Sequence, residues 1–223
     1  MALDVQFLGH SAFLLTDGEY SLLIDPFLSG NPTASARAEE IHCTHIALSH
    51  GHSDHIGDTM SIARRCEAVV VAPFETANFL GEQGLGRVEP GNPGGRVETS
   101  FGSVAFVQAF HSSSYEGRYM GAACGLIISM GGKCMYHCGD TALFGDMQLI
   151  GEVHKPDIAA VPIGDRFTMD ARQGARAAEL IGAPIAVPFH FRTFPLLAQS
   201  AAGFAPRGIQ VQELNPGEHL RLE

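Results

Sequence analysis

Membrane-spanning segments and secretion signals are features that this sequence lacks. No apolar run approaches the roughly 20 residues that a spanning helix needs. The first residues, Met1 to Asp4, contain no basic region followed by an apolar core, which is the pattern of a secretory signal peptide. We therefore expect a cytoplasmic protein that has no membrane partner.

Basic residues are scarce as well. The chain has 14 lysine and arginine residues against 24 aspartate and glutamate residues, which gives a formal net charge of −10. A protein that binds the phosphate backbone of nucleic acid needs the opposite balance, so we expect no nucleic-acid partner. A small anionic substrate stays compatible with this charge, because bound metal ions reverse the local field. The expected partner is therefore a small molecule.

Paired cysteines are also missing. The chain has five cysteines, an odd number, and none of them forms a C-x-x-C pair. This favours reduced thiols over a disulfide framework. Cys134, His137 and Cys138 together admit a metal-binding interpretation, but they lie in a strand-like run where cysteine is a small packing residue. We favour packing for these residues.

The bulk composition is that of one globular domain. The 223 residues are 45% hydrophobic and 17% charged, which is usual for a domain with a buried core. The Gly- and Pro-rich stretch 84–95 is expected to form turns rather than a linker, because strand-like sequence resumes directly after it. We therefore treat residues 1–223 as a single domain. A homo-oligomer is compatible with the sequence.

Short strands alternate with helices along the chain. The first three strand-like runs, 5–8, 12–16 and 20–24, are separated by turns and predict an antiparallel opening to a sheet. Further strands are expected at 45–49, 68–72, 97–99, 104–107, 125–129, 134–138, 158–162, 184–189 and 209–214. Helices are expected at 59–66 with Asp58 as N-cap, at 74–82, at 143–153, and at 171–181 with Asp170 as N-cap.

One stretch, from Ser49 to Asp58, carries four metal-ligand side chains within six residues: His50, His52, Asp54 and His55. Imidazole and carboxylate together suit zinc and its first-row neighbours. A histidine-rich loop can also be solvated and idle, but the density of ligands and the apolar run that leads into them favour metal. The order of the residues suits one metal on the first two histidines and a second on the Asp-His pair, as a two-metal site requires.

Three further candidates follow strand-like runs. They are His111, Asp140 and His190. A lone histidine at a strand end is weak evidence for ligation, and an aspartate there can instead cap a helix. The two oxygens of Asp140 suit a carboxylate that touches two ions, and the preceding Gly139 permits a close backbone approach.

Two more polar residues stand at strand ends in the N-terminal part. His10 either holds a turn through hydrogen bonds or contributes to the site by supporting a ligand or contacting substrate. Asp25 ends a buried strand, where its carboxylate either caps backbone N–H groups or supports a metal ligand.

Taken in order along the chain, these motifs resemble the metallo-β-lactamase superfamily of metal-dependent hydrolases. The motifs are Gly9-His10-Ser11, Leu23-Ile24-Asp25-Pro26-Phe27, the His50 motif, His111, Gly139-Asp140-Thr141, Phe167-Thr168-Met169-Asp170 and Pro188-Phe189-His190-Phe191. Within the superfamily the chain is similar, over essentially its whole length, to the compact hydrolases related to L-ascorbate-6-phosphate lactonase. One departure is that Phe191-Arg192 follows His190 where a tyrosine or a small residue is more common, which bears on the polarity of the pocket.

The resemblance implies an α/β fold, a four-layer αβ/βα sandwich in which two mixed sheets are flanked by helices and the metals lie at one edge between the sheets. It implies a first metal on His50, His52 and His111, and a second on Asp54, His55 and His190, with Asp140 bridging the two.

The expected activity is that of a binuclear metal-dependent hydrolase. Two divalent ions, expected to be zinc with manganese or iron as alternatives, would lower the pKa of a bridging water. The resulting hydroxide would attack a small ester, lactone or phosphoester, and Asp54 would orient it and take its proton. Two other classes stay open: a metallo-nuclease or phosphodiesterase with the same site, and a non-catalytic metal-binding module.

Overall fold

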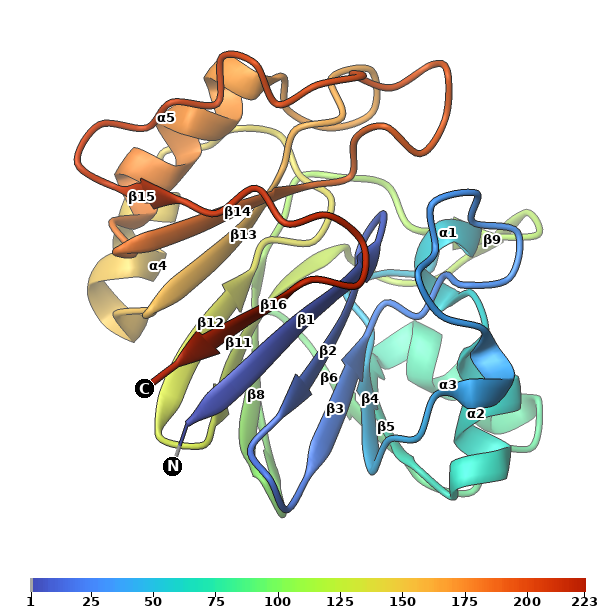
Figure 1. Cartoon of the computed structure of the whole chain (residues 1–223). Coiled ribbons are helices and arrows are strands. Elements are labelled where there is room, and N and C mark those ends of the chain that lie inside the picture. The colour runs from blue at the N-terminus through green and yellow to red at the C-terminus, as the bar shows by residue number, and fades with distance from the viewer. Residues whose placement is uncertain (1) are drawn as a thin grey trace.

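Two seven-stranded sheets form the centre of the molecule in the computed structural model, which describes residues 2–223 (Figure 1). The first sheet contains, in spatial order, β16 (His219–Leu222), β1 (Leu3–Gly9), β2 (Ala12–Thr16), β3 (Ser21–Ile24), β4 (His45–Ala47), β5 (Val69–Pro73) and β6 (Val88–Gly91). The second contains β15 (Gln210–Val211), β14 (Ile185–Phe189), β13 (Ile158–Pro162), β12 (Lys133–His137), β11 (Cys124–Met130), β8 (Gly102–Gln108) and β7 (Arg96–Thr99).

Both sheets are mixed, with antiparallel strands in one half and parallel strands in the other. In the first sheet the pairs from β16 to β3 are antiparallel and those from β3 to β6 are parallel. In the second, the pairs from β7 to β12 are antiparallel and those from β12 to β15 are parallel. The predicted antiparallel opening of the chain is therefore confirmed. A separate short hairpin joins β9 (Ser114–Tyr115) to β10 (Arg118–Tyr119).

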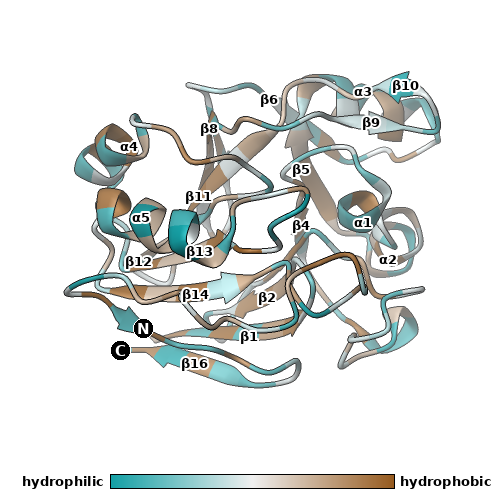
Figure 2. Ribbon diagram, turned by 90° about the horizontal axis from the view of Figure 1, so that it is seen from above, coloured by the Kyte–Doolittle hydropathy of each residue, from teal (hydrophilic) through white to brown (hydrophobic). Residues whose placement is uncertain are grey.

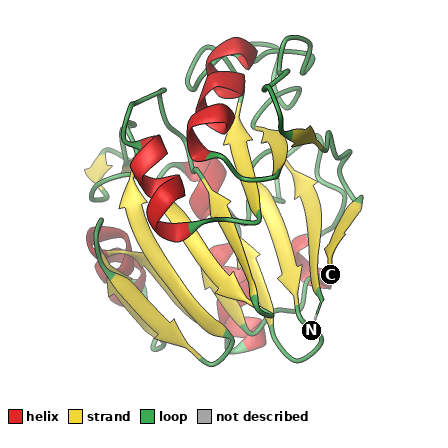
Figure 3. Ribbon diagram, turned by 90° about the vertical axis from the view of Figure 1, so that its left-hand side faces the viewer, coloured by secondary structure: helices red, strands yellow, loops and turns green. Residues whose placement is uncertain are grey.

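Helices cover the outer faces of both sheets (Figure 3). The residues of α2 (Thr59–Cys66) and α3 (Phe74–Glu82) pack in one hydrophobic cluster with the first sheet. Those of α4 (Met147–His154) and α5 (Ala171–Ile181) pack in another with the second sheet. Two shorter helices, η1 (Ala38–Glu40) and α1 (Ser53–Ile56), lie in loops on the side of the first sheet.

A third hydrophobic cluster fills the space between the two sheets. Leu3 and Val5 of β1 contribute to it from the first sheet, and Leu126 and Ile128 of β11 contribute from the second. These side chains recur at every second residue, as the alternation of a strand requires. In Figure 2 the buried strands are largely brown, whereas teal residues lie on the helices and on β16. The predicted four-layer sandwich is confirmed.

Besides the β9–β10 hairpin, two strands of the large sheets were not predicted from the sequence. Residues 84–95 are not all turns, because Val88–Gly91 forms β6, which pairs in parallel with β5. Pro90 lies within it, and an edge strand tolerates proline because one of its sides has no partner. At the C-terminus the strand expected at 209–214 is only the two-residue β15, whereas β16 pairs antiparallel with β1.

The predicted boundaries of α2, α3 and α5 are confirmed, and those of α4 are wrong. α5 begins after Asp170, whose carboxylate accepts the Gln173 N–H at 2.7 Å in a capping box, as predicted. Asp58 does precede α2, but its carboxylate accepts the N–H groups of Leu28 and Ser29 and caps nothing. α4 begins at Met147 rather than 143, since Gly145 is a poor helix former. Within residues 2–223, no helix has both the length and the apolar character that crossing a membrane requires.

All five cysteines are free, as predicted. Cys43, Cys124 and Cys138 are buried, and burial raises the pKa of the Cys43 and Cys124 thiols to about 12. Cys66 is partly exposed at the end of α2, where the Arg65 guanidinium lies 3.5 Å from its Sγ. A reactive thiol needs access and a nearby positive charge. Cys134 is also partly exposed, but burial and Asp157 raise the pKa of its thiol to about 11, so we expect Cys66 to react first.

We expect N-ethylmaleimide to modify Cys66 first, and Cys43, Cys124 and Cys138 only when the protein unfolds. Mass spectrometry of timed samples would show one fast addition, and all five thiols would react in denaturant. The Cys66→Ser variant should lose the fast addition and keep the others. Fast labelling of Cys43 in the folded wild type would contradict this assignment.

Candidate metal centre

Side chains from both sheets converge at one edge of the sandwich. From the first sheet, His10 follows β1, Asp25 follows β3 and residues 50–55 follow β4; from the second, His111, Asp140 and His190 follow β8, β12 and β14. Their ligand atoms form three overlapping groups, and within each group the atoms lie within 4.8 Å of one another: His50, His52 and His111; His50, His55 and Asp140; and His10, Asp54, His55 and His190. The structure thus brings together every residue predicted to bind metal.

His50, His52 and His111, the first group, turn one ring nitrogen each toward a common point. His50 Nε2 lies 2.9 Å from His52 Nδ1. The other ring nitrogens contact serines: His50 Nδ1 is 3.0 Å from Ser49 Oγ, and His52 Nε2 is 3.2 Å from Ser112 Oγ. A neutral imidazole has one donor and one acceptor nitrogen, so a serine that takes the N–H leaves the inward nitrogen with a free lone pair.

Asp54, His55 and His190 belong to the group that also contains His10, and they lie beside the first group; these three residues are called the second group from here on. Asp54 Oδ2 is 3.7 Å from His190 Nε2 and 3.1 Å from His10 Nε2. Asp140 stands between the two groups: its Oδ2 is 3.1 Å from His190 Nε2 and 3.4 Å from His55 Nε2, and also 3.5 Å from His111 Nε2 of the first group. A carboxylate in this position can serve both groups.

Asp25 supports the centre through hydrogen bonds to Ser49 and His55. Its fully buried carboxylate accepts the Ser49 N–H at 2.8 Å, the Ser49 hydroxyl at 2.6 Å and the His55 Nδ1–H at 2.7 Å. Because Nδ1 of His55 carries its proton toward Asp25, Nε2 faces the centre as an acceptor. This is the usual way in which a carboxylate orients a metal-binding histidine.

The residues fit a bound cation. Among the described residues, buried side-chain atoms without a hydrogen-bond partner include His55 Nε2, Asp140 Oδ1, His190 Nδ1 and His190 Nε2. Buried polar atoms nearly always have a partner, and most of these belong to one cluster of imidazole and carboxylate groups. Such donors suit zinc and neighbouring first-row ions.

The electrostatics of the cluster also favour a cation. Burial raises the pKa of the Asp140 carboxyl, but His190 and His55 beside it outweigh burial and hold that pKa well below its usual range. In the opposite sense, burial lowers the pKa of His55, but Asp140 and Asp25 outweigh burial and raise it. The carboxylates thus stay ionised and attract positive charge, which either protons or metal ions can supply.

Three residues of the centre have a left-handed backbone. The φ angles of His10, Asp25 and His190 are 57°, 43° and 62°. This conformation is unfavourable for residues other than glycine and persists only where the surroundings impose it. The His190 N–H donates to the His10 carbonyl at 2.9 Å and the Cys124 N–H donates to the Ser49 carbonyl at 3.0 Å, so backbone hydrogen bonds join the two sheets beside the centre.

The relatives of the chain agree with this centre. Residues 20–191 match the beta-lactamase superfamily domain. A UPF0173 metal-dependent hydrolase of Carboxydothermus hydrogenoformans is 43% identical over 99% of this chain and 100% of the relative, and one of Bacillus mycoides is 46% identical over 98% and 99%. The chain belongs to the UPF0173 metal-dependent hydrolase family. The predicted membership of the metallo-β-lactamase superfamily is confirmed.

Solved structures extend the likeness of this UPF0173 chain to the whole fold. Igni18, a metallo hydrolase of Ignicoccus hospitalis, has 32% identity and a TM-score of 0.90 over 100% of this chain and 99% of its own. An isothiocyanate hydrolase from Delia radicum gut bacteria has a TM-score of 0.74 over 97% and 98%, but at 17% identity it shows the fold alone.

Sequence reasoning missed the residues that shape the ligand loop of this UPF0173 chain. The Gly51 N–H donates to Ser113 Oγ at 3.0 Å, and a Cβ added at Gly51 would lie 2.2 Å from the Cβ of Met120. The glycine between His50 and His52 is therefore required by Met120, which lies far along the chain. No local sequence pattern signals that contact.

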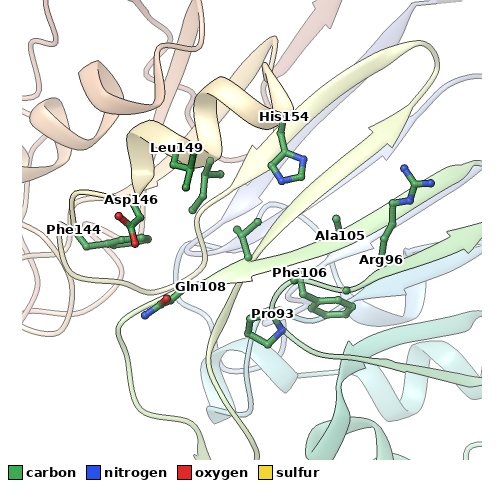
Figure 4. Close-up of a pocket in the computed structure, with 13 residues that line it drawn as sticks. Pro93, Arg96, Ala105, Phe106, Gln108, Phe144, Asp146, Leu149 and His154 are labelled. Carbon is green, nitrogen blue, oxygen red and sulfur yellow. The ribbon is translucent and has the colours of Figure 1, made fainter.

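Two other features of this UPF0173 chain lie outside the centre. His137 is not available as a ligand, because its Nε2 contacts the Ser11 carbonyl and its Nδ1 accepts the Gly139 N–H, both at 3.2 Å. This agrees with a packing role for Cys134 and Cys138. A cavity of about 430 Å³ lies between α4 and β8, with Phe106 and Leu149 in its wall (Figure 4). None of the clustered histidines lines it.

The Asp25→Asn variant tests the support of His55. An amide offers one acceptor oxygen where the carboxylate accepts three hydrogen bonds, so we expect metal affinity to fall about 10- to 100-fold, as for other residues that orient ligands. Competition with a chromogenic zinc chelator would measure it. Asp157→Asn is the control, since Asp157 accepts a backbone N–H from Cys134 away from the centre. Equal zinc affinity in wild type and Asp25→Asn would contradict the assignment.

Proposed function

We propose that the protein is a binuclear metal-dependent hydrolase of a small ester, lactone or phosphoester. The observation that carries the proposal is the position of Asp140, whose Oδ2 lies within 3.5 Å of imidazole nitrogens from both groups. His50, His52 and His111 would hold one divalent ion, and Asp54, His55 and His190 the other, with Asp140 shared. Zinc suits these donors, with manganese or iron as alternatives.

When bound, such ions act as Lewis acids and lower the pKa of coordinated water toward neutrality. The protein itself would contribute a general base. The side chain of Asp54 is 29% exposed, whereas those of His55 and Asp140 are 0% and 3% exposed, so Asp54 borders the open side of the centre. His10 contacts Oδ2 of Asp54, and the Asp54 carboxylate would orient the attacking water and accept its proton.

A small neutral or singly charged substrate fits this protein better than nucleic acid. The net charge of −10 opposes a long phosphate backbone. We therefore place hydrolysis of a small ester, lactone or phosphoester ahead of a metallo-nuclease. A non-catalytic metal-binding module would need no base at the open side of the centre. The five free thiols suit the reducing cytosol, the proposed location.

Metal content is the first test. We expect elemental analysis of the purified wild type, after reconstitution with zinc, to give about two equivalents per chain, as a two-metal site requires. His50→Ala should lose at least one equivalent, since His50 belongs to two of the ligand groups. His154→Ala, on α4 outside the clusters, should keep the wild-type content. Wild type that stays free of metal would overturn the proposal.

Asp54→Asn tests the base. The amide cannot accept a proton, so we expect kcat to fall by about 100-fold or more, in the range of general base catalysis. The assays would use γ-butyrolactone, 4-nitrophenyl acetate and bis(4-nitrophenyl) phosphate, and they also separate lactone and ester from phosphodiester hydrolysis. Wild-type kcat in Asp54→Asn on the best of these compounds would exclude Asp54 as the base.

A further inference from the structure

We propose that Thr193 is a positioning residue, which donates a hydrogen bond to His10 and so fixes the tautomer in which His10 holds Asp54. The inference rests on the proposed function, because it concerns the carboxylate assigned above as the base. It adds a third residue behind Asp54, supplied by the loop after β14 in the second sheet.

The three side chains form a continuous chain of contacts. Thr193 Oγ1 lies 2.8 Å from His10 Nδ1, and His10 Nε2 lies 3.1 Å from Asp54 Oδ2. Thr193 and His10 are 4% and 1% exposed, so water does not compete for these contacts. Asp54 is the only one of the three that reaches the open side of the centre.

Counting protons assigns a direction to each hydrogen bond. An ionised carboxylate only accepts, so the contact between His10 and Asp54 requires the proton on Nε2. A neutral imidazole has one donor and one acceptor nitrogen, so Nδ1 is then the acceptor. The Thr193 hydroxyl must then donate to Nδ1. Its other acceptor, the Phe191 carbonyl, is farther away at 3.4 Å.

The packing around His10 keeps the ring in this orientation. Its centroid lies 4.0 Å from that of His190, 5.5 Å from Phe27 and 5.7 Å from Phe194. Phe194 directly follows Thr193 in the chain, so the same loop supplies both the hydrogen bond and one wall. A ring held on its faces and at Nδ1 presents Nε2–H to Asp54 in one direction.

A competing arrangement makes His10 a metal ligand. Its ligand atom lies within 4.8 Å of those of Asp54, His55 and His190. In that case Nε2 would carry no proton, Nδ1–H would donate to Thr193, and the Thr193 hydroxyl would donate to Phe191. The two arrangements differ in which nitrogen of His10 is protonated, and this can be measured without any substrate.

The test compares Thr193→Val, which removes the hydroxyl at nearly constant shape, with Thr193→Ser, which keeps it. Three measurements are made on zinc-loaded protein: nitrogen-15 NMR of the imidazoles, zinc content, and kcat and KM on the best of the three compounds above. The His10 signals are assigned by their loss in His10→Gln. We expect a proton on Nε2 of His10 in the wild type and in Thr193→Ser.

In Thr193→Val we expect kcat to fall about 10- to 100-fold, the range of activity loss for residues that orient metal ligands. KM and zinc content should stay unchanged, and the Nε2 proton should exchange faster with water. Thr193→Ser should restore kcat. An unprotonated, zinc-bound Nε2 in the wild type would overturn the inference, as would loss of zinc from Thr193→Val. So would a slow Nε2 proton exchange in Thr193→Val equal to that of the wild type.

The NMR result separates this inference from the proposed function. If none of the three compounds is hydrolysed, the proposed function fails for those substrate classes, while the position of the His10 proton and its exchange rate still decide the role of Thr193. If hydrolysis is found and the proton lies on Nδ1, the function stands and the inference falls.

Discussion

The centre depends on one buried carboxylate. Asp25 stands at the end of β3 with no exposed surface, and all of its partners come from the stretch after β4. A buried charge is tolerated only when hydrogen bonds or an opposite charge compensate it. Asp25 obtains that compensation from the backbone and hydroxyl of Ser49 and from the ring of His55. Satisfying this carboxylate therefore also sets the direction in which the loop of residues 50–55 leaves the sheet and the nitrogen of His55 that faces the centre.

Much of the fold and the list of clustered residues could be predicted from the sequence. The ligand types of residues 50–55 are so close together that their chemistry is visible without a structure, and His111, Asp140 and His190 each follow a recognisable strand. Short apolar runs bounded by turn residues predicted most strands correctly, because strands buried on both faces are apolar throughout. β16 escaped prediction because it is short, largely exposed and stabilised by pairing with β1 at the other end of the chain.

The supporting residues could not be predicted, for a physical reason. Ser49, Ser113, Met120 and Thr193 have no pattern of their own, and each matters only through a contact with a residue that is near it in space. Thr193 lies 183 positions from His10 in sequence, and Ser113 lies 62 positions from Gly51. Serine, threonine and methionine are common in loops and cores, so their identity alone predicts nothing. Sequence patterns identify candidate metal ligands because few residue types bind metal. They do not identify the residues that orient those ligands.

The hydrogen bond between His190 N–H and the His10 carbonyl has a consequence for biosynthesis. As the chain is synthesised, His50, His52 and His111 leave the ribosome well before His190. One edge of β1 stays unpaired until residues 219–222 pair with it. A nascent chain can thus offer the three-histidine group while the second group lacks its last histidine. On the proposed assignment of two metals, loading of the second group would follow completion of the chain.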